Sequence, residues 1–309
     1  MTAYIVRRLL LFVPVLVGVS LLVFLIFHIT PGDPVRAMLG EAGQGISAEE
    51  VERIRVQLGL DRPWYTQYVD FLSGAVRGDL GRSFRTGRPV FEEIASRFPF
   101  TARLAAISLL IAVSAGVPAG VVAALQARRW PDIAVTGIVL MGVSMPVFWL
   151  GILLMQAFSL NLRWLPPSGS GTWRHMVLPS ATIAFASVAF IARMTRSALI
   201  EHLGEDYVRT ARAKGLRELT VVGRHALRGT MIPVLTTVGL QFGSLLGGAV
   251  VVESIFGLPG LGRLTVDAIQ ARDLPMIQGA ILWIAVVFNL VNLVVDVLYV
   301  AVDPRIRYR

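Results

Sequence analysis

Six long apolar runs constrain the fold of this chain more than any other feature. They cover roughly residues 9–30, 100–125, 133–160, 178–200, 231–252 and 277–302. A helix needs about 20 apolar residues to cross the roughly 30 Å hydrocarbon core of a bilayer, and each run is near or above that length. Only 16% of the residues are charged. That is too few to form the polar surface that a soluble protein with six such buried helices would need. The sequence therefore predicts an all-α polytopic membrane protein with six transmembrane helices.

Basic residues gather in four of the segments that flank these runs, and their distribution predicts the orientation. The four segments are 1–8, 126–132, 193–229 and 303–309, and together they hold 15 basic and 6 acidic residues. The two short segments on the other side, 161–177 and 253–276, hold 4 basic and 3 acidic residues. Because short loops rich in arginine and lysine stay in the cytoplasm, both termini are predicted to be cytoplasmic. A nucleic-acid-binding protein has its basic residues on one face, whereas here they are divided among four segments next to the membrane, which argues against a nucleic-acid partner.

These spans and loops predict three parts of the chain. Residues 1–30 form an N-terminal segment with the first transmembrane helix, and residues 31–99 form an extracytoplasmic helical segment. Residues 100–309 form a membrane core of five further spans with a cytoplasmic loop at 201–229. The outer segment has no cysteine to form a disulfide, and Ser47 with Glu50 is a capping-box pattern that begins a helix there.

The residues needed for most catalytic sites are missing from the sequence. Lys214 is the single lysine and glycine follows it, whereas a phosphate-binding loop needs serine or threonine at that place. The four histidines have no metal-ligand spacing, and no HExxH or GxSxG motif occurs. We therefore expect no catalytic residue, no metal and no cofactor on this chain, and a role in transport.

A short charged helix is predicted inside the long cytoplasmic loop. Glu205 and Asp206 favour its N-terminal end, Lys214 favours its C-terminal end, and Gly215 is a good stop. Small residues such as Ala211 would let the surface of another protein approach closely. An ordinary solvated loop helix is equally compatible with these residues. The predicted partner-binding residues are Glu205, Asp206, Tyr207, Arg209, Thr210, Ala211, Lys214 and Gly215.

The fifth and sixth runs carry small and polar residues at helical spacing. Three glycines four residues apart, Gly239, Gly243 and Gly247, predict a groove in which another helix packs closely. Polar side chains on these two runs are either the lining of a translocation path or groups that bond between helices, with Asp296 paired to Arg193 or Arg196. The bonding interpretation is favoured for the sixth run. The candidates for path lining are Gln241, Ser244, Asn289, Asn292 and Asp296.

The loop at 207–215 also carries a family resemblance. Together with His225-Ala226-Leu227-Arg228 and Pro233, it resembles the coupling loop of binding-protein-dependent ABC importer permeases. More narrowly, the chain resembles the first permease subunit of the dipeptide and oligopeptide importers. The supporting motifs run along nearly the whole chain: Arg7-Arg8, Pro31-Gly32-Asp33-Pro34, Gly78-Asp79-Leu80-Gly81-Arg82-Ser83, Glu253-Ser254-Ile255-Phe256-Gly257-Leu258-Pro259-Gly260-Leu261-Gly262 and Asp303-Pro304-Arg305. The general importer loop begins Glu-Ala-Ala, and this chain has Arg209-Thr210-Ala211 at those places. The peptide-importer subgroup shows the same kind of replacement.

The resemblance implies a type I ABC importer permease fold in a bacterial inner membrane. It also implies four kinds of partner: a second homologous permease in a heterodimer, two ABC ATPase subunits that bind ATP and Mg²⁺, an extracytoplasmic substrate-binding protein, and membrane lipid. The residues implied for docking of the binding protein are Gly78, Asp79, Glu253, Phe256 and Pro259.

The cargo implied is a dipeptide or oligopeptide, with nickel chelates, glutathione or sugars as alternatives. An ion-coupled secondary transporter is the main rival, but such proteins are commonly built from repeated halves and no repeat is found here. A structural scaffold for cytoplasmic partners is the other rival.

Overall fold

The computed structural model describes residues 2–29, 35–36 and 47–302, and every regular element in these ranges is a helix. Contacts divide the chain into two compact units. The first unit is Met1–Phe100 with Pro259–Asn289, and the second is Thr101–Leu258 with Leu290–Arg309. The all-α prediction is confirmed. The predicted boundaries at 30 and 99 stay a prediction, since the two units group residues by contact and not by membrane side.

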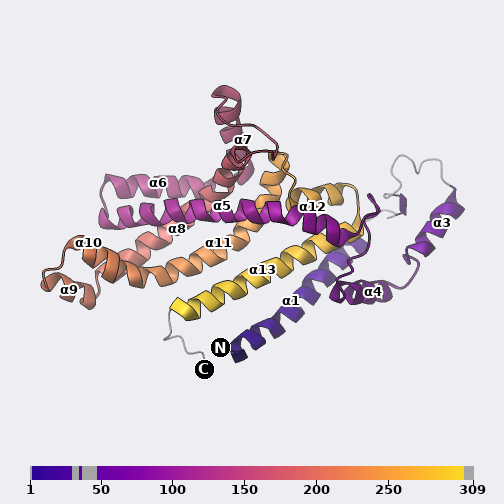
Figure 1. The fold of residues 1–309 in the computed structure, drawn as a ribbon, viewed down its shortest axis with the longest axis horizontal. Coiled ribbons are helices and arrows are strands. Elements are labelled where there is room, and N and C mark those ends of the chain that lie inside the picture. The colour runs from indigo at the N-terminus through magenta and orange to yellow at the C-terminus, as the bar shows by residue number, and fades with distance from the viewer. Residues whose placement is uncertain (1, 30–34, 37–46, 303–309) are drawn as a thin grey trace. The chain divides into compact units, whose positions relative to one another are not determined.

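In the first unit, helices before the membrane core pack with helices from near the C-terminal end. Its helices are α1 (Thr2–Ile29), α3 (Ala48–Gln57), α4 (Trp64–Val76), the start of α5 (Val90–Leu125), α12 (Leu261–Gln270) and the start of α13 (Leu274–Val302) (Figure 1). The side chain of Ser47 accepts a hydrogen bond from the Glu50 backbone N–H at 3.3 Å, so the predicted cap of α3 is confirmed. Buried Leu80, Val90 and Ile94 pack against residues of α12 and α13.

A buried aspartate joins the loop before α5 to the turn before α13. Asp273 is 3% exposed and lies between α12 and α13. Its carboxylate accepts hydrogen bonds from the Ser83 hydroxyl, from the backbone N–H of Phe84 at 3.0 Å and from that of Arg85 at 3.3 Å. The Met276 backbone N–H adds a fourth bond at 3.4 Å. Four donors satisfy a charge that would otherwise be costly to bury, so this carboxylate fixes the loop in place.

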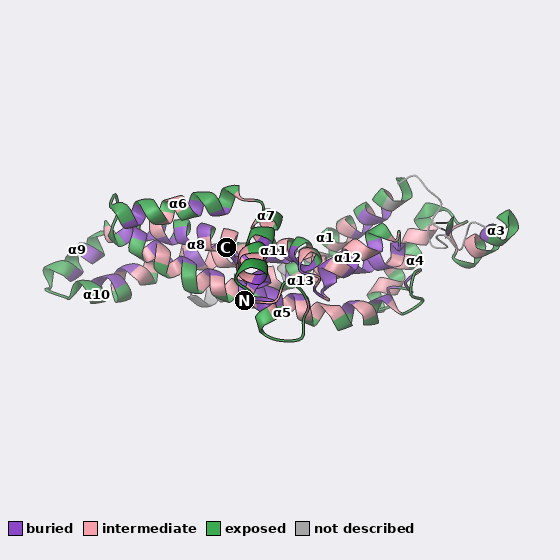
Figure 2. Ribbon diagram, turned by 90° about the horizontal axis from the view of Figure 1, so that it is seen from above, coloured by how far each residue is buried: buried purple, intermediate pink, exposed green. Residues whose placement is uncertain are grey.

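In the second unit, α8 (Arg174–Leu203) lies between α6 (Trp130–Ser144) and α11 (Leu227–Ile255) (Figure 1). Buried residues run along the length of α8, whereas α6 is mostly exposed, as Figure 2 shows. The unit also holds α5 from Thr101 onward and α13 from Leu290 onward. Its other helices are α7 (Val147–Leu154), η2 (Met155–Asn161), α9 (Asp206–Ala213), α10 (Glu218–Thr220) and η3 (Val221–Ala226). The core of the unit therefore lies along the faces that α8 presents to α5, α6 and α11.

Within the described residues, four helices are long and apolar enough to cross a membrane, or five if one bent pair is a single span. The bent pair is α6 followed by α7 with η2, at an angle of 109°. The predicted run 133–160 is therefore not one straight helix. Pro146 disfavours helical backbone at the residue before it, and Met145 accordingly has an extended ψ of 122°. The apolar part of α1 covers Leu10–Ile26, and the count of six spans and the cytoplasmic termini stay predictions.

Glycine allows α5 to approach α8 very closely. A Cβ atom on Gly120 would lie 2.5 Å from the carbonyl oxygen of Ala192 and 2.6 Å from Cβ of Thr195. The first neighbour is backbone and cannot rotate away. The two helices would have to separate to accept any larger residue.

We expect Gly120→Ala to destabilise the protein by about 1–3 kcal/mol, because overpacking forces backbone shifts. Gly137→Ala on α6 is the matched control, since a Cβ there meets no atom within 4 Å. That control is expected to be neutral or slightly stabilising, because alanine favours helix over glycine. Thermal unfolding of the two purified variants in the same detergent tests this, and equal midpoints would contradict the close packing.

Candidate functional site

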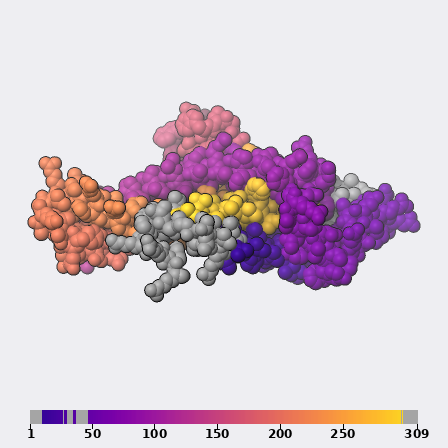
Figure 3. Space-filling model, turned by 60° about the horizontal axis from the view of Figure 1, so that its bottom comes forward, coloured from indigo at the N-terminus to yellow at the C-terminus, as the bar shows by residue number. Residues whose placement is uncertain are grey.

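The short helix predicted near 205–214 exists as α9, which follows α8 after a short turn. Glu205 is its N-cap with extended backbone, and its carbonyl oxygen accepts hydrogen bonds from the backbone N–H groups of Val208 and Arg209. Gly215 ends the segment with φ +73°, a left-handed conformation that glycine adopts without steric cost. The helix begins and ends within one residue of the predicted bounds. Figure 3 shows this part of the chain, in orange, at one end of the second unit.

One face of α9 is buried within this chain. Val208 is 0% exposed and Ala211 is 5% exposed. They pack in one apolar cluster with four residues of other helices, Ala124 of α5, Leu199 of α8, and Val221 and Ala226 of η3. The sequence suggested Ala211 as a small residue facing a partner, but the structure places it toward the chain's own core. Because the cluster joins α9 to three other helices, a displacement of α9 would be transmitted to them.

The opposite face of α9 is polar and exposed. Tyr207 is 44% exposed, and its hydroxyl lies 3.1 Å from Nδ1 of His202. Partial burial and, to a smaller extent, the nearby Glu205 carboxylate raise the pKa of Tyr207 above its usual value. The other predicted residues on this face are also exposed: Glu205, Asp206, Arg209, Thr210, Lys214 and Gly215. This side of α9 therefore carries six exposed polar or small residues and one half-exposed aromatic ring.

Arg212 connects the end of α9 to α10. Its guanidinium donates two hydrogen bonds to the Glu218 carboxylate, at 2.7 and 3.2 Å. The bonds raise the pKa of Arg212 above its usual value. Both side chains are substantially exposed, so the pair adds little to stability but holds the two short helices in one geometry.

A second ion pair, which the sequence analysis missed, joins α6 to α8. Asp132 in the first turn of α6 is 5% exposed, and Arg196 of α8 donates to its carboxylate from Nε at 2.5 Å and from Nη2 at 2.8 Å. The Arg128 backbone N–H adds a third bond at 2.8 Å. Arg196 is thus paired with Asp132, although the sequence suggested Asp296. The side chain of Asp296 lies outside the described part of the structure, and Arg193 is exposed.

The three glycines of α11 have different surroundings. A Cβ atom on Gly239 would lie 2.3 Å from the side chain of Val295 on α13, so this glycine packs closely inside the chain. Gly243 is half-buried, whereas Gly247 is exposed and a Cβ there would meet nothing within 4 Å. The end of the row near Gly247 is therefore open to another chain.

Two of the four described path candidates on α11 and α13 form hydrogen bonds within the chain. Gln241 donates to the Ser187 hydroxyl of α8 at 3.0 Å, and Asn289 donates to the backbone oxygen of Ala285 at 2.8 Å. Asn292 is half-buried, and Ser244 is exposed. Of the four described candidates, Ser244 is the one that this conformation leaves facing outward.

The residues implied for docking divide into exposed and enclosed ones. Gly78 and Asp79 are exposed, and Pro259 is half-buried. Glu253 is 0% exposed and accepts a hydrogen bond from the Thr101 hydroxyl at 2.6 Å, and Phe256 is 1% exposed. In this conformation a docking protein reaches the first three residues but not Glu253 or Phe256.

The long apolar helices and the bent pair are those of a multi-pass membrane protein. Residues 116–308 match the family described as "Binding-protein-dependent transport system inner membrane component", and residues 1–105 match the N-terminal family of the same systems. The chain belongs to this family and is the inner-membrane permease subunit of an ABC importer.

Similar proteins agree with this assignment. The glutathione transport system permease protein GsiC of Escherichia coli O6:H1 is 51% identical over 309 residues, covering 100% of both chains. The GsiC proteins of Escherichia coli K12 and of Shigella dysenteriae serotype 1 are each 50% identical over the same length. A chain of the inward-facing MetNI methionine ABC transporter has a TM-score of 0.58 at 17% identity, covering 68% of this chain and 96% of that chain, which shows a shared fold.

The family assignment confirms several predictions. The chain is a peptide-type ABC permease subunit of the bacterial inner membrane and not an enzyme, since ATP hydrolysis belongs to a separate subunit of such importers. An ATPase and a substrate-binding protein are its partners. Among the described residues, no group of three or more histidine, aspartate and glutamate side chains could hold a metal ion, and the absence of a metal or cofactor stays a prediction.

Proposed function

We propose that α9 is the helix through which ATPase subunits drive this permease. The observation that carries the proposal is its two-sided environment. Val208 and Ala211 lie in an apolar cluster shared with α5, α8 and η3, while Tyr207, Arg209 and Lys214 face outward. A rigid helix fixed to several others on one side and free on the other can pass a rigid-body motion to them. ATP and Mg²⁺ would bind on the ATPase subunits, and this chain would bind no cofactor.

We further propose that a second, homologous permease completes the translocation path, as a heterodimer. Exposed Gly247, Ser244 and Leu240 on α11 support this, because they form a row that a second chain can cover. In this proposal the path is lined by polar residues of both chains, with Ser244, Gln241, Asn289, Asn292 and Asp296 as this chain's contribution.

The proposed cargo is a short peptide, and glutathione is the first to test. The support is the 50–51% identity over the whole chain to permeases named for glutathione transport. A substrate-binding protein would deliver the peptide to the outer face, near Gly78, Asp79 and Pro259. Glu253 and Phe256 would become reachable only after a conformational change.

The test is ATP-dependent uptake of radiolabelled glutathione by proteoliposomes that contain the complete importer and its binding protein. Tyr207→Ala is expected to lower uptake roughly tenfold, because exposed tyrosines often dominate the energy of an interface. Tyr65→Ala is the matched control, since Tyr65 is 56% exposed on α4 and is expected to leave uptake unchanged. Uptake that stops with a proton uncoupler while ATP stays high would contradict ATP-driven import and favour an ion-coupled transporter.

A further inference from the structure

An imidazole ring supports the exposed tyrosine of α9. His202 lies in the last turn of α8, five residues before Tyr207. Its Nδ1 is 3.1 Å from the Tyr207 hydroxyl oxygen, a hydrogen bond in which either group can donate. The centroids of the two rings are 6.4 Å apart, at an interplanar angle of 57°. Tyr207 is 44% exposed all the same, so the ring that contacts His202 also presents surface to a partner.

A glycine on α11 leaves the space that this imidazole occupies. Gly229 lies in the first turn of α11. A Cβ atom there would lie 2.8 Å from Cε1, 2.9 Å from Nδ1 and 3.0 Å from Nε2 of His202. These distances are shorter than van der Waals contact, so any side chain at position 229 would push the ring away. The missing Cβ of Gly229 therefore determines where the imidazole of His202 can lie.

The direction of the Tyr207 ring depends on this contact more than on the apolar cluster of α9. Among the described residues, the cluster that holds α9 includes Val208 and Ala211 but not Tyr207. The hydrogen bond of the Tyr207 hydroxyl goes to His202. The contacts therefore run in order from Gly229 on α11 to His202 on α8 and on to Tyr207 on α9.

A side chain that is already held in one orientation binds a partner more tightly than a mobile one. Ordering one flexible side chain at an interface lowers affinity by roughly two- to tenfold. Exposed tyrosines are among the residues that most often dominate the energy of an interface. A residue that fixes the Tyr207 ring beforehand would therefore strengthen a contact made through that ring.

We propose that His202 is a positioning residue for the ATPase contact. It holds the Tyr207 ring in the orientation that an ATPase subunit binds, and Gly229 in turn holds the imidazole. The inference rests on the proposed function of α9 and adds to it two residues outside α9, which act through Tyr207.

The test uses the complete importer in nanodiscs, immobilised through a tag on this chain, and measures how fast the ATPase subunits dissociate after dilution. His202→Ala is expected to raise the dissociation rate roughly fivefold, because Tyr207 loses its partner and becomes mobile. Tyr207→Phe removes the hydroxyl alone and is expected to raise the rate roughly threefold. The midpoint of thermal unfolding should stay near that of the parent in both variants, since a single bond to an exposed hydroxyl adds little to stability.

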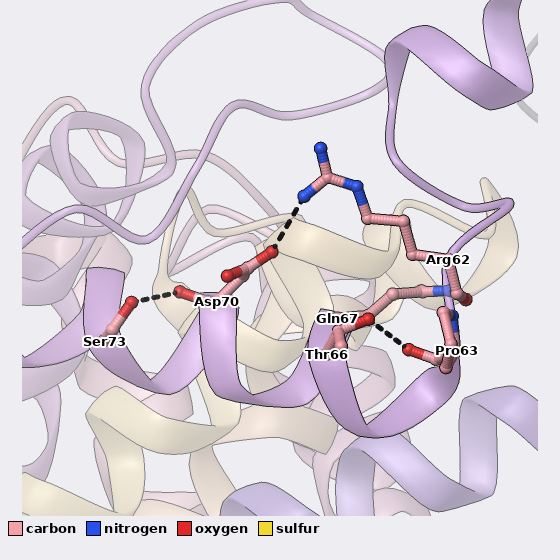
Figure 4. A network of polar contacts seen from close by, with 6 residues as sticks. All are labelled: Arg62, Pro63, Thr66, Gln67, Asp70 and Ser73. Carbon is pink, nitrogen blue, oxygen red and sulfur yellow. Dashed lines mark hydrogen bonds and ion pairs between the residues drawn. The ribbon is translucent and has the colours of Figure 1, made fainter.

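Two controls remove the same chemical groups elsewhere in the chain. His175→Ala deletes an imidazole at the start of α8 whose Nδ1 lies 2.9 Å from the Thr172 hydroxyl oxygen. Ser73→Ala deletes an exposed hydroxyl on α4 that donates to the backbone oxygen of Asp70 at 2.9 Å, as Figure 4 shows. Both controls are expected to release the ATPase subunits at the rate of the parent.

Gly229→Ala tests the order of the contacts. Its added methyl group is expected to displace the His202 ring and to raise the dissociation rate about as much as His202→Ala does. The double variant should be no faster than either single one, because the ring that the methyl group displaces is absent from it. Additive effects of the two changes would show that Gly229 acts apart from His202, and the proposal would be wrong.

The remaining outcomes separate this proposal from the proposed function. If His202→Ala lowers the unfolding midpoint and leaves the dissociation rate at the parent value, His202 only packs α8 against α11 and positions nothing. A faster rate in Tyr207→Ala with parent rates in His202→Ala and Gly229→Ala would overturn the positioning role alone. Parent rates in all three variants would overturn both proposals, since Tyr207 would then not contact an ATPase subunit.

Discussion

Val208→Asp is expected to abolish glutathione uptake and the stimulation of ATPase activity by the loaded binding protein. Val208 is 0% exposed and lies in the apolar cluster that joins α9 to the rest of the second unit. A carboxylate in that cluster would have no partner, and burying an unpaired charge costs several kcal/mol. Helix α9 would therefore no longer pack in this cluster, and a movement of the ATPase subunits would not be transmitted to α5 and α8.

Basal ATPase activity of the assembled importer is expected to persist in this variant, since the ATPase subunits are separate chains. Uptake into proteoliposomes and ATP hydrolysis, measured on one preparation, give both values. Val76→Asp is the matched control, because Val76 is 83% exposed on α4 and tolerates a charge. Uptake in Val208→Asp equal to that of the control would contradict the role of the cluster.

Asp132→Leu is expected to have the largest effect on stability. The change leaves Arg196 without its carboxylate and removes the acceptor of the Arg128 backbone N–H. Breaking one side of a largely enclosed ion pair is strongly destabilising, although the Arg196 side chain is 31% exposed and water offsets part of the loss. The midpoint of thermal unfolding in detergent is expected to fall by roughly 5 °C.

A double variant separates the ion pair from simple packing. Asp132→Leu with Arg196→Leu removes both charges, and most of the lost stability is expected to return because no unpaired charge remains. Asp267→Leu is the control, since its 3.9 Å contact with Arg263 is exposed and contributes little. If Asp132→Leu unfolds at the same temperature as Asp267→Leu, the account of this pair is wrong.

The parts of the structure that depend on neighbouring residues were predictable from the sequence. The charges at each end of α9 and the glycine after it set its bounds, and Ser47 set the start of α3, because caps act within one turn of a helix. The apolar runs indicated the long helices, since span length is a local property. The Met145-Pro146 bend also had a local signal, although the run around it is continuously apolar.

Features that depend on distant parts of the chain were not predictable in the same way. The pairing of Asp132 with Arg196 joins residues 64 positions apart, and no periodicity marks it. The inward face of α9 was set by residues of α5 and η3, so Ala211 could not be placed from its own segment. Glu253 and Phe256 belong to a motif that suggested a docking surface, yet the packing of the second unit encloses them.

Lysine-directed cross-linking with mass spectrometry tests the central claim, that ATPase subunits bind at α9. Lys214 is the single lysine of the chain and is exposed at the end of α9, so apart from the N-terminal amine every such cross-link must start there. We expect Lys214 to be cross-linked to an ATPase subunit in the intact importer, and Lys214→Arg to remove that product while uptake continues. An ATPase that co-purifies and is cross-linked to the second permease, but never to Lys214, would contradict the account.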